Sequence, residues 1–195
     1  MAGQPNIQFQ RPVPTFLVRP KNLSIEVSIP RNVLHLLGGQ VEIIQDKYFR
    51  TIHRWMPIIS TKRLRRLAKD ITTEPRADLA LLLLCMKLIA DHPISNTIDW
   101  ARNSLYYSAK SLHCSIRCAK RYSTTFLQAG LLISLYELGH AIHPEAQASV
   151  VANAELGIKL GIKEAASWRM EPAPSSWTES EERTRVWWGV MILDR

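Results

Sequence analysis

Three neighbouring residues, His113, Cys114 and Cys118, have side chains that can bind a metal ion. The two cysteines are four positions apart, so on a helix they share one face. A structural zinc site needs four ligands, usually supplied as two close pairs. The chain has three cysteines, and Cys85 is the only other thiol, so no second pair is available. We therefore interpret these thiols as ordinary buried or half-buried side chains and expect no metal in this chain.

Other residue types that support catalysis form no recognisable motif. The sequence contains no Gly-rich phosphate loop and no G-x-S-x-G nucleophile elbow. Glu179, Glu181 and Glu182 are crowded together, but in the first turn of a predicted helix the helix dipole favours acids. No nucleophile is paired with a base and an orienting group. The sequence thus predicts no catalytic residue and no cofactor; an enzyme or carrier with a helix-lined pocket is a third hypothesis. The remaining histidines are scattered: His35, His53, His92, His140 and His143.

A basic cluster lies at the end of the first third of the chain. It comprises Lys62, Arg63, Arg65 and Arg66. Residues 1–70 carry 12 Lys and Arg against 4 Asp and Glu, whereas residues 71–195 carry 13 of each, so the net charge of +8 belongs to the first part. No aromatic residues alternate with the cluster, as a platform for single-stranded nucleic acid requires. We interpret the cluster as a solvated helix face, with weak, sequence-independent phosphate contacts as the alternative.

Six tryptophans are a high count for 195 residues, and two of them, Trp187 and Trp188, are adjacent. On a helix their side chains point about 100° apart. One is expected to pack inward and the other to line a groove or an interface. Because Trp is favoured at binding hot spots, we assign the pair as an effector or partner surface, with an ordinary core role as the alternative.

Periodicity and proline positions predict an all-α protein. Residues 1–31 contain five prolines, which block helices and sheet ladders, so this segment is expected to be a Pro-rich arm or linker. Within it, the alternating stretch 23–29 could form one short strand. From residue 32 to 195 apolar residues recur at helical spacing, and the connections between helices are short. We expect one helical domain over 32–195, an irregular bundle or array of about seven helices.

Capping residues and prolines predict the helix boundaries. The first helix, interrupted at Gly38-Gly39, is expected to carry Trp55 on its apolar face and to end before Pro57. Ser60 is expected to precede a short basic helix, and Pro75 an apolar helix. Asn96 or Thr97 is expected to cap a helix over 98–120, and Ser123 and Pro144 each to mark the start of a further helix. A capping box formed by Thr178 and Glu181 is expected to open the last helix, over 179–195.

The sequence also predicts the compartment. Its longest apolar run, Leu79–Met86, has eight residues, whereas a membrane-spanning helix needs roughly 20. The N-terminal residues lack the basic start and apolar stretch of a secretory signal. A low, odd number of cysteines fits a reducing compartment. We therefore expect a soluble intracellular protein that does not contact a membrane.

The C-terminal string EERTRVWWGVMILDR, residues 181–195, resembles the signature of the fungal-specific transcription factor domain. The family pattern is E-x-R-R-R-x-W-W-x-x-x-x-x-D-R, with Thr184 here in place of one arginine. Three further segments agree in order: YFRTIHRWMPII at 48–59, LQAGLLISLY at 127–136 and AELGIKLG at 154–161. The resemblance covers the chain from about residue 40 onwards.

Two arginines of this signature, Arg183 and Arg185, follow the acidic first turn of the last predicted helix. We expect them to pair with acids on neighbouring helices. The motif is then a packing and ion-pair device rather than a catalytic one.

The resemblance implies an all-helical regulatory domain of a nuclear transcription regulator, which acts through protein partners or a small effector. In the family, DNA binding belongs to a separate N-terminal module in which six cysteines hold two zinc ions. This sequence has three cysteines and no C-x-x-C, so zinc is expected only in that missing module, and DNA contact only indirectly. Because the family domain continues past the D-R pair, the sequence resembles a fragment, a truncated gene model or a degenerate paralogue. A standalone helical protein that associates with a full-length regulator is the alternative.

Overall fold

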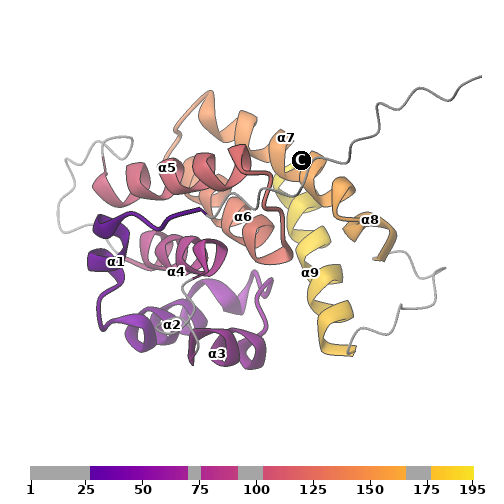
Figure 1. The fold of residues 1–195 in the computed structure, drawn as a ribbon. Helices are drawn as coiled ribbons and strands as arrows, with labels where there is room; N and C mark the ends of the chain where they lie inside the picture. Colours follow the sequence, from indigo (N-terminus) through magenta and orange to yellow (C-terminus); the bar gives the residue numbers. More distant parts are fainter. Residues whose placement is uncertain (1–26, 70–75, 92–102, 166–176) are drawn as a thin grey trace, which may run out of the picture.

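The fold was taken from a computed structural model, which describes residues 27–69, 76–91, 103–165 and 177–195 (Figure 1). These residues form helices and irregular connections, with no strand among them. The elements are α1 (Arg31–Leu37), α2 (Val41–Arg50), the short 3-10 helix η1 (Ile52–Arg54), α3 (Thr61–Lys69), α4 (Ala77–Ala90), α5 (Ser104–Cys118), α6 (Thr124–Gly139), α7 (Glu145–Lys159), α8 (Ile162–Ala165) and α9 (Trp177–Leu193). The predicted all-α fold is therefore confirmed. None of the described helices is long and apolar enough to span a membrane.

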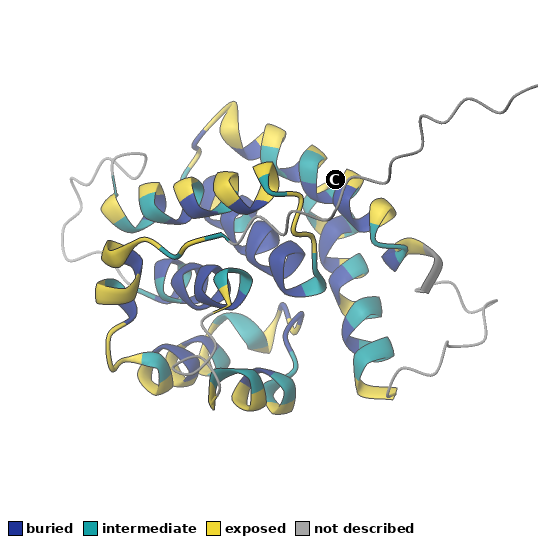
Figure 2. Ribbon diagram, in the orientation of Figure 1, coloured by how far each residue is buried: buried dark blue, intermediate teal, exposed yellow. Residues whose placement is uncertain are grey.

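Helices α4 and α6 form the centre of the protein because neither has a fully polar face. Every side chain of α4 from Leu79 to Met86 is buried, and so is every residue of α6 from Thr125 to Ser134. The two helices pack on each other; α4 also contacts α1, α2 and α5, and α6 also contacts α5, α7 and α9. Figure 2 shows both as almost continuously buried, with exposed residues on the outer helices. A fully buried Leu contributes about 1.5–3 kcal/mol, so these two helices supply much of the stabilisation.

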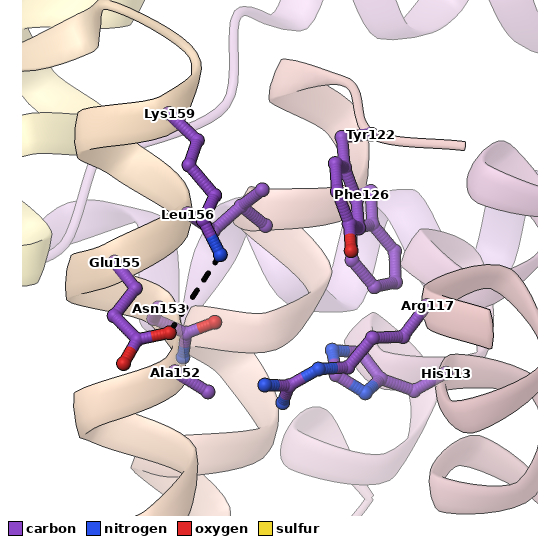
Figure 3. Close-up of a pocket in the computed structure, with 9 residues that line it drawn as sticks. All are labelled: His113, Arg117, Tyr122, Phe126, Ala152, Asn153, Glu155, Leu156 and Lys159. Carbon is purple, nitrogen blue, oxygen red and sulfur yellow. Dashed lines mark ion pairs between the residues drawn. The ribbon is translucent and has the colours of Figure 1, made fainter. Parts of the chain in front are cut away.

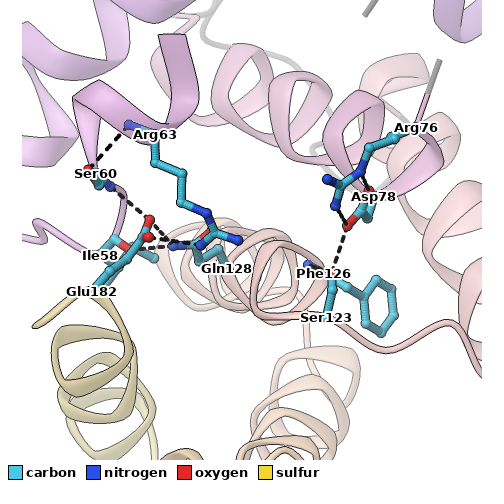
Figure 4. Close-up of polar contacts among 9 residues, drawn as sticks. All are labelled: Ile58, Ser60, Arg63, Arg76, Asp78, Ser123, Phe126, Gln128 and Glu182. Carbon is cyan, nitrogen blue, oxygen red and sulfur yellow. Dashed lines mark hydrogen bonds and ion pairs between the residues drawn. The ribbon is translucent and has the colours of Figure 1, made fainter. Parts of the chain in front are cut away.

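A polar contact joins the N-termini of α4 and α6. Ser123, the N-cap of α6, accepts a hydrogen bond from the Phe126 backbone N–H (3.0 Å) and donates one to Asp78 Oδ2 (2.7 Å) in the first turn of α4. Arg76 holds the same carboxylate with two hydrogen bonds (Figure 4). Burial disfavours the Asp78 carboxylate, but the hydrogen bonds from Arg76 and Ser123 outweigh burial and lower the pKa of Asp78. The contact fixes where both central helices begin.

Several predicted boundaries agree with the structure. Ser60 and Ser123 precede α3 and α6, and Pro144 precedes α7, as their capping or first-turn positions predict. The glycine pair separates α1 from α2, and Gly39 has a φ of +68°, a left-handed conformation that glycine adopts without a steric penalty.

Three local predictions are wrong. Helix α2 ends at Arg50, and η1 follows with a different periodicity, so Trp55 leaves the apolar face and is 59% exposed. The N-cap of α5 is Asn103, whose side chain accepts from the Leu105 N–H (2.9 Å), rather than Asn96 or Thr97. Helix α9 begins at Trp177, so Thr178 lies inside the helix and does not open a capping box.

Other predictions lie wholly or partly outside the described residues. These are most of the Pro-rich arm and of the stretch 23–29, and the segment 98–102 of the expected helix. Residues 27–30, which are described, form no strand.

Candidate functional site

The signature helix α9 packs one face tightly against the rest of the protein. Its buried residues are Glu182, Val186, Gly189 and Val190. A Cβ on Gly189 would lie 3.0 Å from Ile58 Cγ2 and 3.3 Å from Leu131 Cδ1. A side chain there would push α9 away from α6 and from the segment before α3, so the glycine of the signature sets the distance between these elements.

Glu182 is buried (4% exposed) and joins three parts of the chain. Its Oε1 accepts hydrogen bonds from the Ser60 backbone N–H (2.9 Å) and from Gln128 Nε2 on α6 (2.8 Å). Its Oε2 forms an ion pair with Arg63 Nη1 on α3 (2.8 Å). Gln128 Nε2 also donates to the Ile58 carbonyl (2.6 Å). We call these five residues the Glu182 cluster (Figure 4). Every carboxylate oxygen has a partner, as a buried charge requires.

Sequence reasoning missed this role of Glu182, which it explained by the helix dipole. A signal existed in Gln128, a long polar side chain in the middle of the otherwise apolar helix α6. A buried amide needs partners, so such a residue indicates that a polar group from another element lies opposite.

The two arginines of the signature pair differently from the prediction. Arg183 donates to the backbone carbonyls of Leu160 (2.9 Å) and Gly161 (3.2 Å) between α7 and α8. Arg185 pairs with Glu181 on its own helix. The structure thus corrects the expected ion pairs with acids on neighbouring helices: Arg183 caps carbonyls at the end of α7, and Glu182 supplies the inter-helix ion pair.

Trp187 and Trp188 point in different directions. Trp187 is partly buried against the core and lies over Gly157 of α7, where a Cβ would be 3.1 Å from its ring. Trp188 is 62% exposed, and Ile192, one turn later, is 63% exposed. Of the pair assigned to an effector or partner surface, Trp188 is therefore the residue that faces solvent.

The predicted basic cluster lies on α3. Arg63 is turned inward to Glu182, and its side chain is 22% exposed. Lys62, Arg65 and Arg66 are exposed. Leu64 between them is buried and Leu67 is partly buried against the core, so α3 presents a basic outer face and is held by these two leucines and the Glu182 cluster.

The three thiols are in different environments. Cys85 is completely buried, and burial, with the nearby Glu137, raises the pKa of its thiol. Cys114 and Cys118 are exposed, rather than buried or half-buried as expected. Cys114 and Cys118 approach each other within hydrogen-bonding distance. No group of three or more His, Cys, Asp or Glu side chains in the described part of the chain could hold a metal ion.

A groove that the sequence did not predict lies between α5 and α7, above α6. It contains two adjoining pockets that share His113, Arg117, Ala152 and Asn153. The pocket toward Lys110 and Ser149 encloses ≈ 110 Å³, and the pocket toward Tyr122 and Phe126 encloses ≈ 30 Å³. Figure 3 shows the second pocket, with Arg117 extending from α5 toward α7. A groove of this kind arises from the packing of three helices, which periodicity along one helix does not reveal.

The basic side chains of the groove are mostly neutralised. Lys110 Nζ contacts Glu137 Oε1 (2.8 Å) and Ser149 Oγ (3.1 Å), and Lys159 pairs with Glu155 (3.8 Å). Among the described residues no acid pairs with Arg117. Burial, followed by the charges of Lys110 and Arg117, lowers the pKa of His113 to about 4, so its ring is neutral at pH 7. Arg117 is therefore the lining cation for which the described residues supply no acidic partner.

Comparison with known proteins agrees with the signature. The fungal specific transcription factor domain model matches residues 46–195. A protein named Transcription factor BOA15, from Botryotinia fuckeliana, is 38% identical over 145 residues, which make up 74% of this chain and 80% of that protein. No solved structure matches the fold. The family match begins in α2 and runs through the Glu182 cluster, the groove and α9, and on this evidence the chain belongs to the fungal specific transcription factor domain family.

Proposed function

We propose that this chain regulates transcription through protein partners or a small effector, and that it does not itself read a DNA sequence. The main support for this proposal is a contrast within the chain. The family match extends over residues 46–195, while the sequence contains three cysteines and no C-x-x-C for a zinc cluster. Trp188 and Ile192, two exposed apolar residues one turn apart on the signature helix, support a role in partner contacts.

A reporter assay tests the proposed function. The chain is fused to an unrelated DNA-binding module whose operator lies upstream of a reporter gene in a fungal host. We expect reporter output to differ severalfold from that of the module alone, and the difference to disappear when the operator is scrambled. If the fusion is present and folded but gives the same reporter output as the module alone, the result contradicts a transcriptional role. A fluorescent fusion of the chain is expected to accumulate in the nucleus.

The exposed basic face of α3 supports only weak DNA contact. We predict that the purified chain binds duplex DNA without sequence preference and that the affinity falls steeply as salt rises. Replacing Lys62, Arg65 and Arg66 by Gln reduces the salt dependence, whereas Arg121→Gln, an exposed arginine outside the cluster, leaves it nearly unchanged. Sequence-selective binding in a competition gel shift at physiological salt contradicts the prediction.

The second candidate is a standalone helical protein that associates with a full-length regulator. It is favoured by BOA15, a relative named as a transcription factor, because the match covers 80% of that protein and leaves only about a fifth of it for any other module. Purification of the tagged chain from its own cells distinguishes the two candidates. Co-purification of a family member with a six-cysteine module, with zinc in proportion to that partner, supports the association; purification of the chain without such a partner rejects it.

A further inference from the structure

We propose that the groove between α5 and α7 binds a small organic acid, whose single carboxylate pairs with Arg117 and whose flat apolar body lies toward Phe126. This inference deepens the proposed function, on which it rests for its regulatory meaning, by naming the chemical class of effector. Three features of the groove support this ligand class: its charge, its polar floor and its apolar wall.

The charge of the groove favours a ligand with one negative charge. Three cations, Lys110, Arg117 and Lys159, line the two pockets. Glu137 behind Lys110 and Glu155 beside Lys159 neutralise two of them. One positive charge is left on Arg117, the cation that borders both pockets. The planar guanidinium can hold a carboxylate through two parallel hydrogen bonds.

The floor of the groove is polar and fixed in place. Asn153 on α7 is 3% exposed, and its Nδ2 donates to Ser134 Oγ on α6 (2.9 Å). Its Oδ1 lies directly over Gly130, since a Cβ on that glycine would be 2.2 Å away. The absence of a side chain at Gly130 therefore lets the amide lie against α6. With the Ser149 hydroxyl, this gives the larger pocket fixed hydrogen-bonding groups around Arg117, as ligand sites require for orientation.

The other end of the groove is an aromatic stack. The Phe126 ring stacks with those of His113 (centroid distance 4.5 Å, interplanar angle 19°) and Tyr122 (6.1 Å, 25°). Leu156 completes the wall of this pocket. In Figure 3 the Arg117 side chain overlaps the His113 ring, and both are seen below the Tyr122 and Phe126 rings. A planar apolar group fits such a wall, and its attached carboxylate then faces the cationic end.

The size of the groove sets the size of the ligand. The larger, polar pocket has a volume of ≈ 110 Å³ and the pocket beside Phe126 one of ≈ 30 Å³. Neither alone reaches the roughly 150 Å³ of an apolar cavity that accepts benzene, so a ring has to span both pockets. The groove thus suits a molecule with one ring or a short chain, not a nucleotide or a peptide.

Benzoate is the probe for this site, and its binding to the purified chain is followed by NMR. We expect saturable shifts of the backbone amides near His113, Arg117 and Asn153. Benzyl alcohol, which has the same ring without the charge, is expected to bind at least about tenfold more weakly, since a hydrogen-bonded ion pair is lost. Arg117→Gln weakens benzoate binding by a similar factor, whereas Arg121→Gln, outside the groove, has no effect.

A second readout is the titration of His113. The charged groups that line the groove with it are Lys110 and Arg117 on its own helix and Glu155 and Lys159 on α7. Bound benzoate adds a negative charge to this set and is expected to raise the pKa of His113. A ligand that stabilises the fold without placing an anion in the groove is not expected to raise this pKa. In Arg117→Gln the pKa of His113 is expected not to respond to benzoate.

Three results overturn the proposal: shifts that do not saturate, equal affinity for benzoate and benzyl alcohol, and binding of inorganic phosphate in place of benzoate. The reporter assay is independent of these measurements. A chain that binds benzoate but leaves the reporter unchanged keeps the site and rejects the proposed function. A fusion that regulates the reporter without benzoate binding by the chain rejects the site alone.

Discussion

At the scale of single residues, Glu182 and Glu181 show how neighbouring acids of one motif differ in role. Glu181 lies on the outside of α9 and pairs with Arg185 one turn later. Glu182 lies on the inside and satisfies donors from Ser60, Arg63 and Gln128. An exposed pair within one helix contributes little, whereas removal of one partner of a buried ion pair leaves donors without an acceptor.

We predict that Glu182→Gln lowers the free energy of unfolding by about 2–3 kcal/mol, because the new amide places N–H groups opposite a donor. Urea unfolding followed by circular dichroism measures the change. The matched variant Glu181→Gln is expected to cost less than about 0.5 kcal/mol. Similar losses for the two variants contradict the assignment of Glu182 as the acid that joins α9 to α3 and α6.

His113 predicts a pH dependence of stability. The pKa of its ring is about 4 in the folded chain and near 6.5 when unfolded. As the pH falls below 6.5, the unfolded chain takes up a proton that the folded chain does not, so stability decreases between pH 6.5 and 4 by up to about 3 kcal/mol. His53, whose pKa is also lowered by burial, acts in the same direction.

The variant His113→Gln isolates this contribution. We expect its free energy of unfolding to depend less on pH between 6.5 and 4 than that of the unchanged chain. His35→Gln, at an exposed position of α1, serves as the control and should retain the full slope. If the free energy of unfolding of His113→Gln depends on pH between 6.5 and 4 as steeply as that of the unchanged chain, His113 is not a buried, neutral imidazole.

At the scale of the helices, the spacing between α6 and α7 depends on a position without a side chain. A Cβ at Gly130 meets the Asn153 amide at 2.2 Å, whereas a Cβ at Gly139, in the last turn of the same helix, meets nothing within 4 Å. We predict that Gly130→Ala lowers the free energy of unfolding by about 1–3 kcal/mol through overpacking. Gly139→Ala is expected to be neutral or to stabilise by up to about 1 kcal/mol, because alanine favours the helix. Thermal unfolding compares them, and equal melting temperatures contradict the close contact.

The helices themselves could largely be predicted from the sequence, and the contacts between them could not. The apolar run before Pro93 specifies α4, and Ser123 marks the start of α6, because burial and capping are local properties. The predicted start of α5 was wrong because several polar residues before the helix qualify as N-caps, and the local sequence does not decide among them. The Glu182 cluster and the groove depend on residues from three helices each, so no single periodicity reveals them.

At the scale of the whole molecule, one apolar core extends from α1 to α9 and includes residues of nearly every helix. Because no helix has a separate core, we predict that the chain unfolds in one cooperative transition. Tryptophan fluorescence, which reports in part on Trp187 against α7, and far-ultraviolet circular dichroism are expected to give coincident urea midpoints. Separate midpoints contradict a single folding unit.

The span of the Glu182 cluster has a consequence for synthesis on the ribosome. Its contacts join residues 60 and 63 to residue 182, which are 122 and 119 positions apart. At roughly 5–20 residues per second, the early partners wait about 6 to 24 s for the carboxylate to be made. Helix α6 is made partway through this interval, and the apolar face against which α9 packs is uncovered on the nascent chain from then until α9 follows. Among the described helices α9 is translated last, so it covers a face of the core that the helices made before it leave open, and we expect chaperones to bind that face until the signature helix is made.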